Sequence, residues 1–275
     1  VSKISGMLNG TSNFILSNME EGAEFHSTLE LAQKEGYAEP DPTFDIEGMD
    51  AAHKIGILSA LAFGTSLPPK DFYVEGITKI EKSDFTYAMD MGYTVKHLAV
   101  AKVDENLLEL RAHPALIKLD SHLANLKGVR NGMEIDTDLI GKIHIAGSGA
   151  GKESTASGLI SDLINLANSK AINDQLDNNS ITSYEVSEFS ELIFQYYFYI
   201  EAEDKPGVMA SITSLMASKQ VGIESIVQKE ELDENCVPII LITDPFKESD
   251  HSELHKELLT IESVKNIRSI RIESN

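Results

Sequence analysis

The stretch Gly36–Gly64 reads GYAEPDPTFDIEGMDAAHKIGILSALAFG and changes character halfway along. In its first half, Pro40 and Pro42 hold the chain extended and remove two backbone N–H donors, so no regular element is expected there. In its second half, apolar residues recur at helical spacing over 51–63, and Gly64 is a typical C-terminal stop. The stretch therefore predicts an irregular loop that leads into a core helix.

One acid and one lysine share a face of that helix. Asp50 and Lys54 are four residues apart, and the same row continues through Ile57 and Leu61, whose apolar side chains predict a buried stripe. The pair has two interpretations. It is either an exposed ion pair worth roughly 0.3–0.5 kcal/mol, or a lysine that transfers protons, with a pKa tuned by burial and by the carboxylate. Spacing alone favours the exposed pair.

The loop before the helix is crowded with acids. Glu39, Asp41 and Asp45 all precede Asp50 within a short distance along the chain. Acidic groups that converge beside one lysine suit a ligand that carries an ammonium group, because a charge-assisted hydrogen bond joins the two.

Three segments closely resemble the catalytic signature of homoserine dehydrogenase. They are GYAEPDP at 36–42 followed by Asp45, GMDAAHK at 48–54, and GMLNGTSNFIL at 6–16. These motifs are long and specific, and the matching order continues through most of the chain. The resemblance favours the proton-transferring interpretation of Lys54.

The resemblance implies a role for each matching residue. Lys54 would donate and accept the proton at the substrate oxygen that is reduced or oxidised. Glu39 and Asp50 would hold the substrate ammonium group, with Asp45 supporting them from behind. The Asn-Gly-Thr segment that ends at Thr11 would border the substrate pocket; from composition alone it is a turn in which Thr11 caps a helix.

A glycine-rich loop reads GSGAGK and ends at Lys152. It lacks the spacing and the following Ser or Thr of a Walker loop, and Lys152 stands where a dinucleotide fingerprint has its third glycine. The resemblance instead implies a loop that closes over the nicotinamide of NAD or NADP, with Gly149 and Gly151 touching the cofactor. Gly36 is implied to contact the cofactor too, although a plain C-cap glycine is the alternative. The family usually has proline where this chain has Ser154.

Residues 1–172 are expected to form the catalytic and dimerisation domain. Short elements predict strands at 94–102 and 107–112, joined by a hairpin turn, and a helix near 84–91. By resemblance this region is a mixed sheet covered by helices, which also makes a homodimer contact. The expected fold class is therefore α+β.

Residues 193–275 have a βαββαβ order of elements, after a polar linker at 173–192. This module resembles an ACT domain, and the string DKPGV is its most recognisable part. ACT domains typically pair through their sheets and bind amino acids at the shared interface. The implied effector-binding residues are therefore Asp204, Pro206 and Gly207, with a helix-start turn that binds nothing as the alternative. Threonine is the expected effector from pathway logic only.

Composition bounds the remaining classes. A chain of 275 residues with 42% hydrophobic content can bury one large core or two smaller ones. No apolar run approaches the roughly 20 residues of a membrane span, and the net formal charge of -21 argues against nucleic acid or anionic membrane as a partner. The single Cys236 fits a reducing cytoplasm. Neither His97 nor His113 has a second ligand at metal spacing, so no metal site is predicted.

No strand–Gly-x-Gly-x-x-Gly–helix unit occurs in the sequence. The resemblance begins after the place where the family's nucleotide-binding domain should lie. The chain is therefore expected to be the C-terminal part of a monofunctional homoserine dehydrogenase and to be inactive alone. The complete enzyme would interconvert L-homoserine and L-aspartate 4-semialdehyde with NAD or NADP, in threonine and methionine biosynthesis, as a homodimer or homotetramer. The alternative is a regulatory protein that binds amino acids through its ACT domain and uses its first domain as a scaffold.

Overall fold

The computed structural model describes residues 1–65, 72–149, 151–168, 184–229 and 236–273. The elements of the N-terminal part are β1 (Lys3–Met7), α1 (Gly10–Glu20), α2 (Phe25–Lys34), α3 (Thr43–Ile46), α4 (Met49–Phe63), β2 (Tyr73–Val74), α5 (Lys82–Asp90), β3 (Tyr93–Asp104), β4 (Leu107–Lys118), β5 (Arg130–Asp136), β6 (Lys142–Ser148) and α6 (Lys152–Asn168). The later elements are β7 (Glu185–Val186), the 3-10 helix η1 (Phe189–Glu191), β8 (Ile193–Glu203), α7 (Val208–Ser218), β9 (Ile223–Gln228), β10 (Cys236–Thr243), β11 (Phe246–Lys247), α8 (Glu248–Leu258) and β12 (Val264–Ile272).

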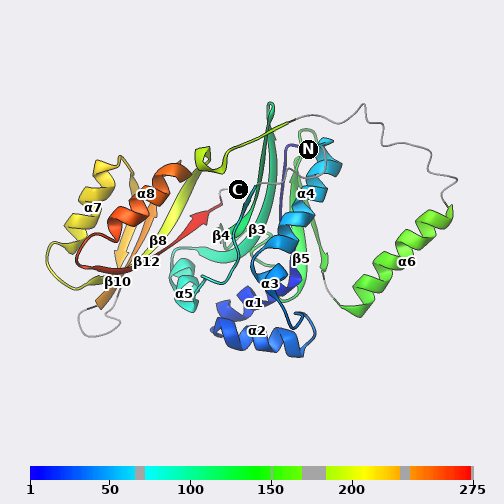
Figure 1. Ribbon diagram of the computed structural model, residues 1–275, viewed down its shortest axis with the longest axis horizontal. Helices are drawn as coiled ribbons and strands as arrows, with labels where there is room; N and C mark the ends of the chain where they lie inside the picture. The colour runs from blue at the N-terminus through cyan, green and yellow to red at the C-terminus, as the bar shows by residue number, and fades with distance from the viewer. Residues whose placement is uncertain (66–71, 150, 169–183, 230–235, 274–275) are drawn as a thin grey trace.

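A single sheet runs through both parts of the molecule, in the strand order β6-β5-β1-β3-β4-β12-β8-β10-β9 (Figure 1). Neighbouring strands in this order are antiparallel except at the centre, where the short strands β2 and β7 also pair with β4 in parallel. There β12 lies parallel to β4, with Arg271 opposite Ala115 and Ile272 opposite Leu116. The mixed sheet covered by helices that the resemblance implies is therefore confirmed. Its continuity across the two parts is a feature that the sequence pattern does not contain.

Helix α4 packs on the N-terminal half of the sheet. Its buried face carries Ala51, Ala52 and Ile55, which contact Ile4 and Ala99 on the strands beneath. The row through Lys54 faces the other way: Ile57 is 50% exposed and Leu61 is 78% exposed. The predicted buried stripe on that row is therefore wrong, because the apolar residues that face the sheet are offset around the helix from Lys54.

The C-terminal part has the predicted βαββαβ order, with the sheet order β12-β8-β10-β9. Helices α7 and α8 cover one face of this sheet, where Ile212 and Leu254 pack over Phe198 (Figure 1). The other face joins the core of the N-terminal part, since Tyr197 and Tyr199 pack in one cluster with residues of α1 and α5. The two parts thus share a hydrophobic core as well as a sheet.

Two further sequence predictions can be compared with the structure. The hairpin turn between β3 and β4 is confirmed: Asp104 pairs with Leu107, and Glu105 adopts a positive φ of 52°. The cap of α1 is Asn9 and not Thr11, because the Asn9 side chain accepts from the Ser12 N–H. Asn is at least as good a cap as Thr, and it stands one residue before the first helical position.

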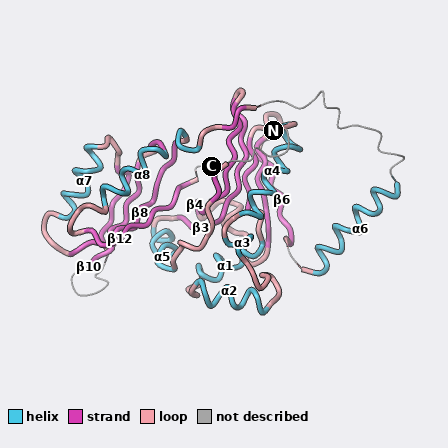
Figure 2. The backbone as a smooth tube through the Cα atoms, in the orientation of Figure 1, coloured by secondary structure: helices cyan, strands magenta, loops and turns pink. Residues whose placement is uncertain are grey.

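The predicted linker is only partly within the described residues, since 173–183 lies outside them. Residues 184–192 of the linker are described and make ordered contacts: β7 pairs with β4, and the ring of Phe189 stacks on Tyr73 at 3.7 Å. Helix α6 has no buried residue and lies apart from the sheet (Figure 2). Within the described part of the chain, no helix combines the length and the apolar character that crossing a membrane requires.

Candidate active site

The centre of the candidate site is the side chain of Asn9, which is 6% exposed. Its Nδ2 donates to Asp45 Oδ1 at 2.7 Å and to Asp50 Oδ2 at 2.8 Å. Its Oδ1 accepts from the backbone N–H of Ser12 at 2.7 Å. One amide therefore begins helix α1 and also holds two carboxylates together. Charge-assisted bonds of this kind are typically worth about 1.5–3 kcal/mol each.

Lys54 completes this cluster. Its Nζ donates to Asp50 Oδ2 at 2.7 Å and to the carbonyl oxygen of Leu8 at 2.9 Å. The Lys54 side chain is 44% exposed and that of Asp50 is 21% exposed, so the ammonium group is held in place yet reachable from outside. Asp50 lies in the first turn of α4, where the helix dipole favours a carboxylate. The ion pair predicted from spacing is confirmed, within a larger polar network.

The other predicted substrate-binding residues lie around this cluster. Thr11 is buried and donates from Oγ1 to the Tyr37 carbonyl oxygen at 2.7 Å, which ties α1 to the acidic loop. Glu39 is exposed in that loop and is not part of the hydrogen-bonded cluster. Asp41 is held locally, because its Oδ1 accepts from the N–H and the hydroxyl of Thr43. These two hydrogen bonds lower the pKa of the Asp41 carboxyl.

Different structural features explain why glycine occupies each of the three predicted cofactor-binding positions. Gly36 and Gly151 adopt positive φ values of 76° and 108°, and a Cβ on either would meet no atom within 4 Å. A Cβ on Gly149 would lie 2.3 Å from the side chain of Asn131, so this glycine is needed for packing within the chain. Asn131 Nδ2 donates to the Leu8 carbonyl oxygen at 3.0 Å, the same oxygen that accepts from Lys54.

Asn131 also offers an unused acceptor. Its Oδ1 is buried and has no hydrogen-bond partner among the described residues. This atom lies beside Gly149, in the corner where the resemblance puts the nicotinamide. A donor group such as an amide would satisfy it.

The sequence did not reveal the contacts of Asn9 and Asn131; the resemblance placed the segment 9–11 beside the substrate pocket but gave Asn9 no role of its own, and Asn131 was not among the predicted site residues. The Asn-Gly pair at 9–10 predicts a turn. Nothing in its spacing shows that Asn9 bonds to Asp45 and Asp50, which lie 36 and 41 positions further along the chain. Asn131 is 123 residues from Leu8 along the chain. No local pattern contains such pairings, because they depend on which strands become neighbours.

His97 and His113 are both buried and hydrogen-bonded within the fold. His97 Nε2 lies 2.9 Å from the Glu75 carbonyl oxygen, and burial lowers the pKa of the ring. His113 is fully buried, and its Nε2 accepts from Arg111 Nη1 at 2.8 Å while Nδ1 lies 2.8 Å from the Pro114 oxygen. Burial and the nearby guanidinium hold the pKa of His113 well below its usual range.

The three predicted effector-binding residues lie elsewhere. Asp204, Pro206 and Gly207 are exposed at the turn before α7, and Gly207, the N-cap of that helix, has a positive φ of 97° that glycine adopts without strain. Helix α7 stands at the left end of the molecule in Figure 1, whereas α4 lies in the N-terminal part, to the right of the centre. The candidate active site around Lys54 and the candidate effector site at the turn before α7 are therefore separate regions of the structure.

Comparison with known proteins agrees with this geometry. A family model described as homoserine dehydrogenase matches residues 1–164. The homoserine dehydrogenase of Pseudomonas aeruginosa is 40% identical over 98% of this chain, which spans 64% of that relative's length. The crystal structure of a homoserine dehydrogenase from Thiobacillus denitrificans covers 99% of this chain with a TM-score of 0.89 and 36% identity, and the match spans 64% of that protein.

A more distant solved structure carries a ligand. It is a hyperthermophilic archaeal homoserine dehydrogenase in complex with NADPH. The sequences are 28% identical, the match covers 60% of this chain and 47% of the archaeal chain, and the TM-score is 0.50. The family match, the high identity to curated relatives and the Asn9–Asp50–Lys54 cluster in one fold lead to one conclusion. The chain belongs to the homoserine dehydrogenase family.

Proposed function

We propose that this chain is the substrate-binding and proton-transferring part of an enzyme that interconverts L-homoserine and L-aspartate 4-semialdehyde. The observation that carries the proposal is the cluster in which Lys54 Nζ lies 2.7 Å from Asp50 Oδ2 and 2.9 Å from the Leu8 oxygen. An ammonium group fixed by two acceptors keeps its third proton for a substrate. The Lys54 ammonium group is oriented by the Asp50 carboxylate and the Leu8 carbonyl, and its side chain remains partly exposed.

In this mechanism Lys54 donates a proton to the carbonyl oxygen of the semialdehyde as it is reduced, and accepts the hydroxyl proton of homoserine in the reverse direction. Asp50 and Glu39 hold the substrate ammonium group, and Asp45 supports Asp50 through the shared Asn9 amide. Thr11 fixes the wall of the pocket through its bond to the Tyr37 oxygen. Positioning of this kind lowers the barrier because the reacting groups are already aligned.

NAD or NADP would supply or accept the hydride when bound. Gly36, Gly149 and Gly151 would line its nicotinamide end, and the unused Asn131 Oδ1 would accept a hydrogen bond from it. The archaeal relative in complex with NADPH supports a nicotinamide cofactor. Because the chain spans 64% of its Pseudomonas relative, the rest of the cofactor site is assigned to a further domain, and the chain alone is expected to be inactive.

The βαββαβ module is proposed to be an ACT domain that regulates the enzyme, with Asp204, Pro206 and Gly207 at its effector site. Support comes from the sheet order β12-β8-β10-β9 and from the exposed, glycine-led start of α7. Threonine would be the effector of a threonine and methionine pathway, and a homodimer or homotetramer in the cytoplasm would be the working form. The competing function is a non-catalytic regulator that binds amino acids through this module alone.

The test is a steady-state assay on the longest natural protein that contains this chain. Lys54→Ala is expected to lower kcat by about 10²–10⁴-fold, the usual contribution of a general acid, with a small change in KM. Asp50→Asn is expected to raise the KM for homoserine, because it removes a charge from the ammonium site. Normal turnover by the Lys54→Ala protein would remove the lysine from its assigned role. Threonine binding without homoserine binding in calorimetry would favour the regulator instead.

A further inference from the structure

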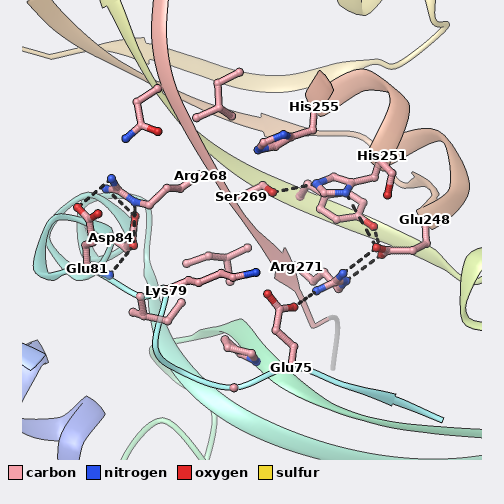
Figure 3. A pocket seen from close by; sticks show the side chains of 18 of the residues that line it. Glu75, Lys79, Glu81, Asp84, Glu248, His251, His255, Arg268, Ser269 and Arg271 are labelled. Atoms are coloured by element: carbon pink, nitrogen blue, oxygen red, sulfur yellow. Dashed lines mark hydrogen bonds and ion pairs between the residues drawn. The ribbon is translucent and has the colours of Figure 1, made fainter. Parts of the chain in front are cut away.

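The side chain of Asn131 differs in one respect from the buried polar networks elsewhere in the chain. In the network between the two parts of the molecule, Arg271 bonds Glu248 at 2.7 Å and Glu75 at 2.8 Å, so charges of opposite sign meet (Figure 3). The Oδ1 atom of Asn131 is buried and has no hydrogen-bond partner in the described part of the chain. An unsatisfied buried atom requires an explanation, and a role at a functional site can supply one.

The orientation of the Asn131 amide is fixed by the chain itself. Its Nδ2 donates to the carbonyl oxygen of Leu8 at 3.0 Å. The reverse orientation would bring two oxygen acceptors together, and neither of them could donate. The same Leu8 oxygen accepts from Lys54 Nζ at 2.9 Å. A carbonyl oxygen has two lone pairs, so these two donors occupy both of them and hold the carbonyl group together.

The Leu8 carbonyl helps to decide where the third proton of Lys54 points. An ammonium group carries three protons, and Asp50 Oδ2 accepts another of them at 2.7 Å. Once two protons are directed, the tetrahedral geometry of the nitrogen fixes the third. The Lys54 side chain is 44% exposed, so packing alone does not restrict it. Its direction therefore depends on the position of the Leu8 oxygen and, through that oxygen, on Asn131.

The segment that leads into Asn131 is anchored to helix α1 by buried side chains. Asn13 Nδ2 donates to the Arg130 carbonyl oxygen at 2.9 Å, and Ser17 Oγ accepts from the Gly128 N–H at 3.2 Å. Asn13 and Ser17 are only 3% and 4% exposed. Hydrogen bonds in such a site are strengthened by the low local dielectric. The Asn131 side chain therefore projects from a fixed backbone.

The glycine-rich loop packs on the same amide. Asn131 on β5 lies opposite Gly147 on β6, and the loop follows the end of β6. A Cβ on Gly149 would lie 2.3 Å from Cγ and Nδ2 of Asn131 and 2.6 Å from its Oδ1. Because the amide group is planar, a shift of the loop toward any of these atoms also moves the Nδ2 that holds the Leu8 oxygen.

We propose that Asn131 is a positioning residue for Lys54. It holds the Leu8 oxygen that directs the ammonium group, and it transmits the position of the loop at Gly149 to that group. This inference rests on the proposed function, because the direction of a Lys54 proton affects turnover only if Lys54 transfers that proton. It gives a physical link between the glycine-rich loop and the lysine, which are far apart in the sequence.

The positioning is tested by NMR on the 275-residue chain, labelled with ¹³C at the lysine Cε atoms. The Lys54 resonance is assigned from its loss in Lys54→Arg, and ¹³C relaxation gives the order parameter of its Cε–H bonds. In Asn131→Ala this order parameter should fall below about 0.6, the range of flexible groups. The control is Asn125→Ala, because Asn125 Nδ2 donates to the Ser121 oxygen at 3.0 Å and so loses an equivalent hydrogen bond away from Lys54.

The transmission from the loop is tested by the same measurement on Gly149→Ala. Its new Cβ displaces the Asn131 amide, so the Lys54 order parameter should fall as it does in Asn131→Ala. The matched control is Gly147→Ala, in the strand that leads to the loop, where a Cβ meets nothing within 4 Å. That variant should leave the Lys54 order parameter unchanged.

Steady-state kinetics on the longest natural protein that contains this chain measures the consequence for turnover. Asn131→Ala is expected to lower kcat about 10–100-fold, the scale of a misplaced reacting group, and to change the KM for homoserine less than about threefold. The KM is spared because Asn9, and not Asn131, holds the carboxylates of Asp45 and Asp50. A purely structural role would lower stability without this split between kcat and KM.

The outcomes separate the two hypotheses. An unchanged Lys54 order parameter in Asn131→Ala, or an equal fall in Asn125→Ala, overturns the positioning. Equal order parameters in Gly149→Ala and Gly147→Ala overturn the transmission from the loop. A lowered order parameter together with a normal kcat supports the positioning and instead contradicts the proton-transferring role of Lys54 in the proposed function.

Discussion

Asn9 Nδ2 and Asp50 Oδ2 are joined by a 2.8 Å hydrogen bond, and the same carboxylate oxygen accepts from Lys54 at 2.7 Å. The neutral Asn9 amide thus lies between the Asp50–Lys54 ion pair and the second carboxylate, that of Asp45. Two carboxylates in one small site would repel each other without a shared donor. Asn9 is therefore the residue on which the arrangement of the acidic site depends.

Asn9→Ala is expected to destabilise the chain by about 2–4 kcal/mol, because it removes the cap of α1 and two charge-assisted bonds. Urea unfolding measures this loss. Asn9→Asp is the matched variant: it keeps the capping oxygen but adds a third carboxylate. The loss in its free energy of unfolding should be large near neutral pH and should shrink in acid, as the clustered carboxylates take up protons. A deficit in Asn9→Asp that is independent of pH would contradict this account.

Arg271→Met is expected to cost about 3–5 kcal/mol, since it leaves Glu248 and Glu75 buried or half-buried without their cation. The loss should appear in chemical denaturation as a lower midpoint. Lys247→Met is the control, because Lys247 pairs with Glu191 at an exposed position and should contribute less than about 1 kcal/mol. Similar losses in the two variants would show that the Arg271 network does not join the two parts.

Stability should fall with acidification through His251. Burial lowers the pKa of His251 from 6.5 to about 4. The folded-state pKa is below the unfolded one, so between these values the unfolded chain binds the proton and the folded chain does not. The contribution is fully present above about pH 6.5 and is lost as pH falls toward about 4, by about 2 kcal/mol between about pH 7 and 5.

The variant His251→Phe isolates this contribution. A phenyl ring can keep the stack on Tyr196, whose ring centroid is 4.2 Å away, while it cannot take up a proton. Denaturation midpoints near pH 7 and near pH 5 should differ less in His251→Phe than in the unmodified chain. An unchanged difference would show that His97 and His113, whose pKa values burial also lowers, account for the acid sensitivity.

Gly149→Ala is expected to destabilise the chain by about 1–3 kcal/mol, because the new Cβ would lie 2.3 Å from the Asn131 side chain and displace it from the Leu8 oxygen. Gly158→Ala is the control: it lies within α6, where a Cβ meets nothing within 4 Å. Since α6 has no buried residue, Gly158→Ala should leave the global unfolding midpoint unchanged. A loss of equal size in both variants would contradict the assigned contact with Asn131.

The sequence by itself determined the local elements and the lysine–carboxylate pair. The helix that ends at Gly64, the β3–β4 hairpin and the βαββαβ order all follow from apolar periodicity and turn residues, which report on neighbours along the chain. The spacing of Asp50 and Lys54 predicts their contact because a helix brings positions four apart together.

Only the tertiary structure decided what surrounds that pair. Asn9 meets Asp45 because α1 packs beside α3, and Arg271 meets Glu75 across 196 residues of sequence because β12 lies next to β4. Periodicity also could not show that Leu61 is exposed while Ile55 is buried, because both fit an apolar helix face and only the position of the sheet selects one. Contacts between distant segments depend on strand order, and a local pattern carries no information about which strands become neighbours.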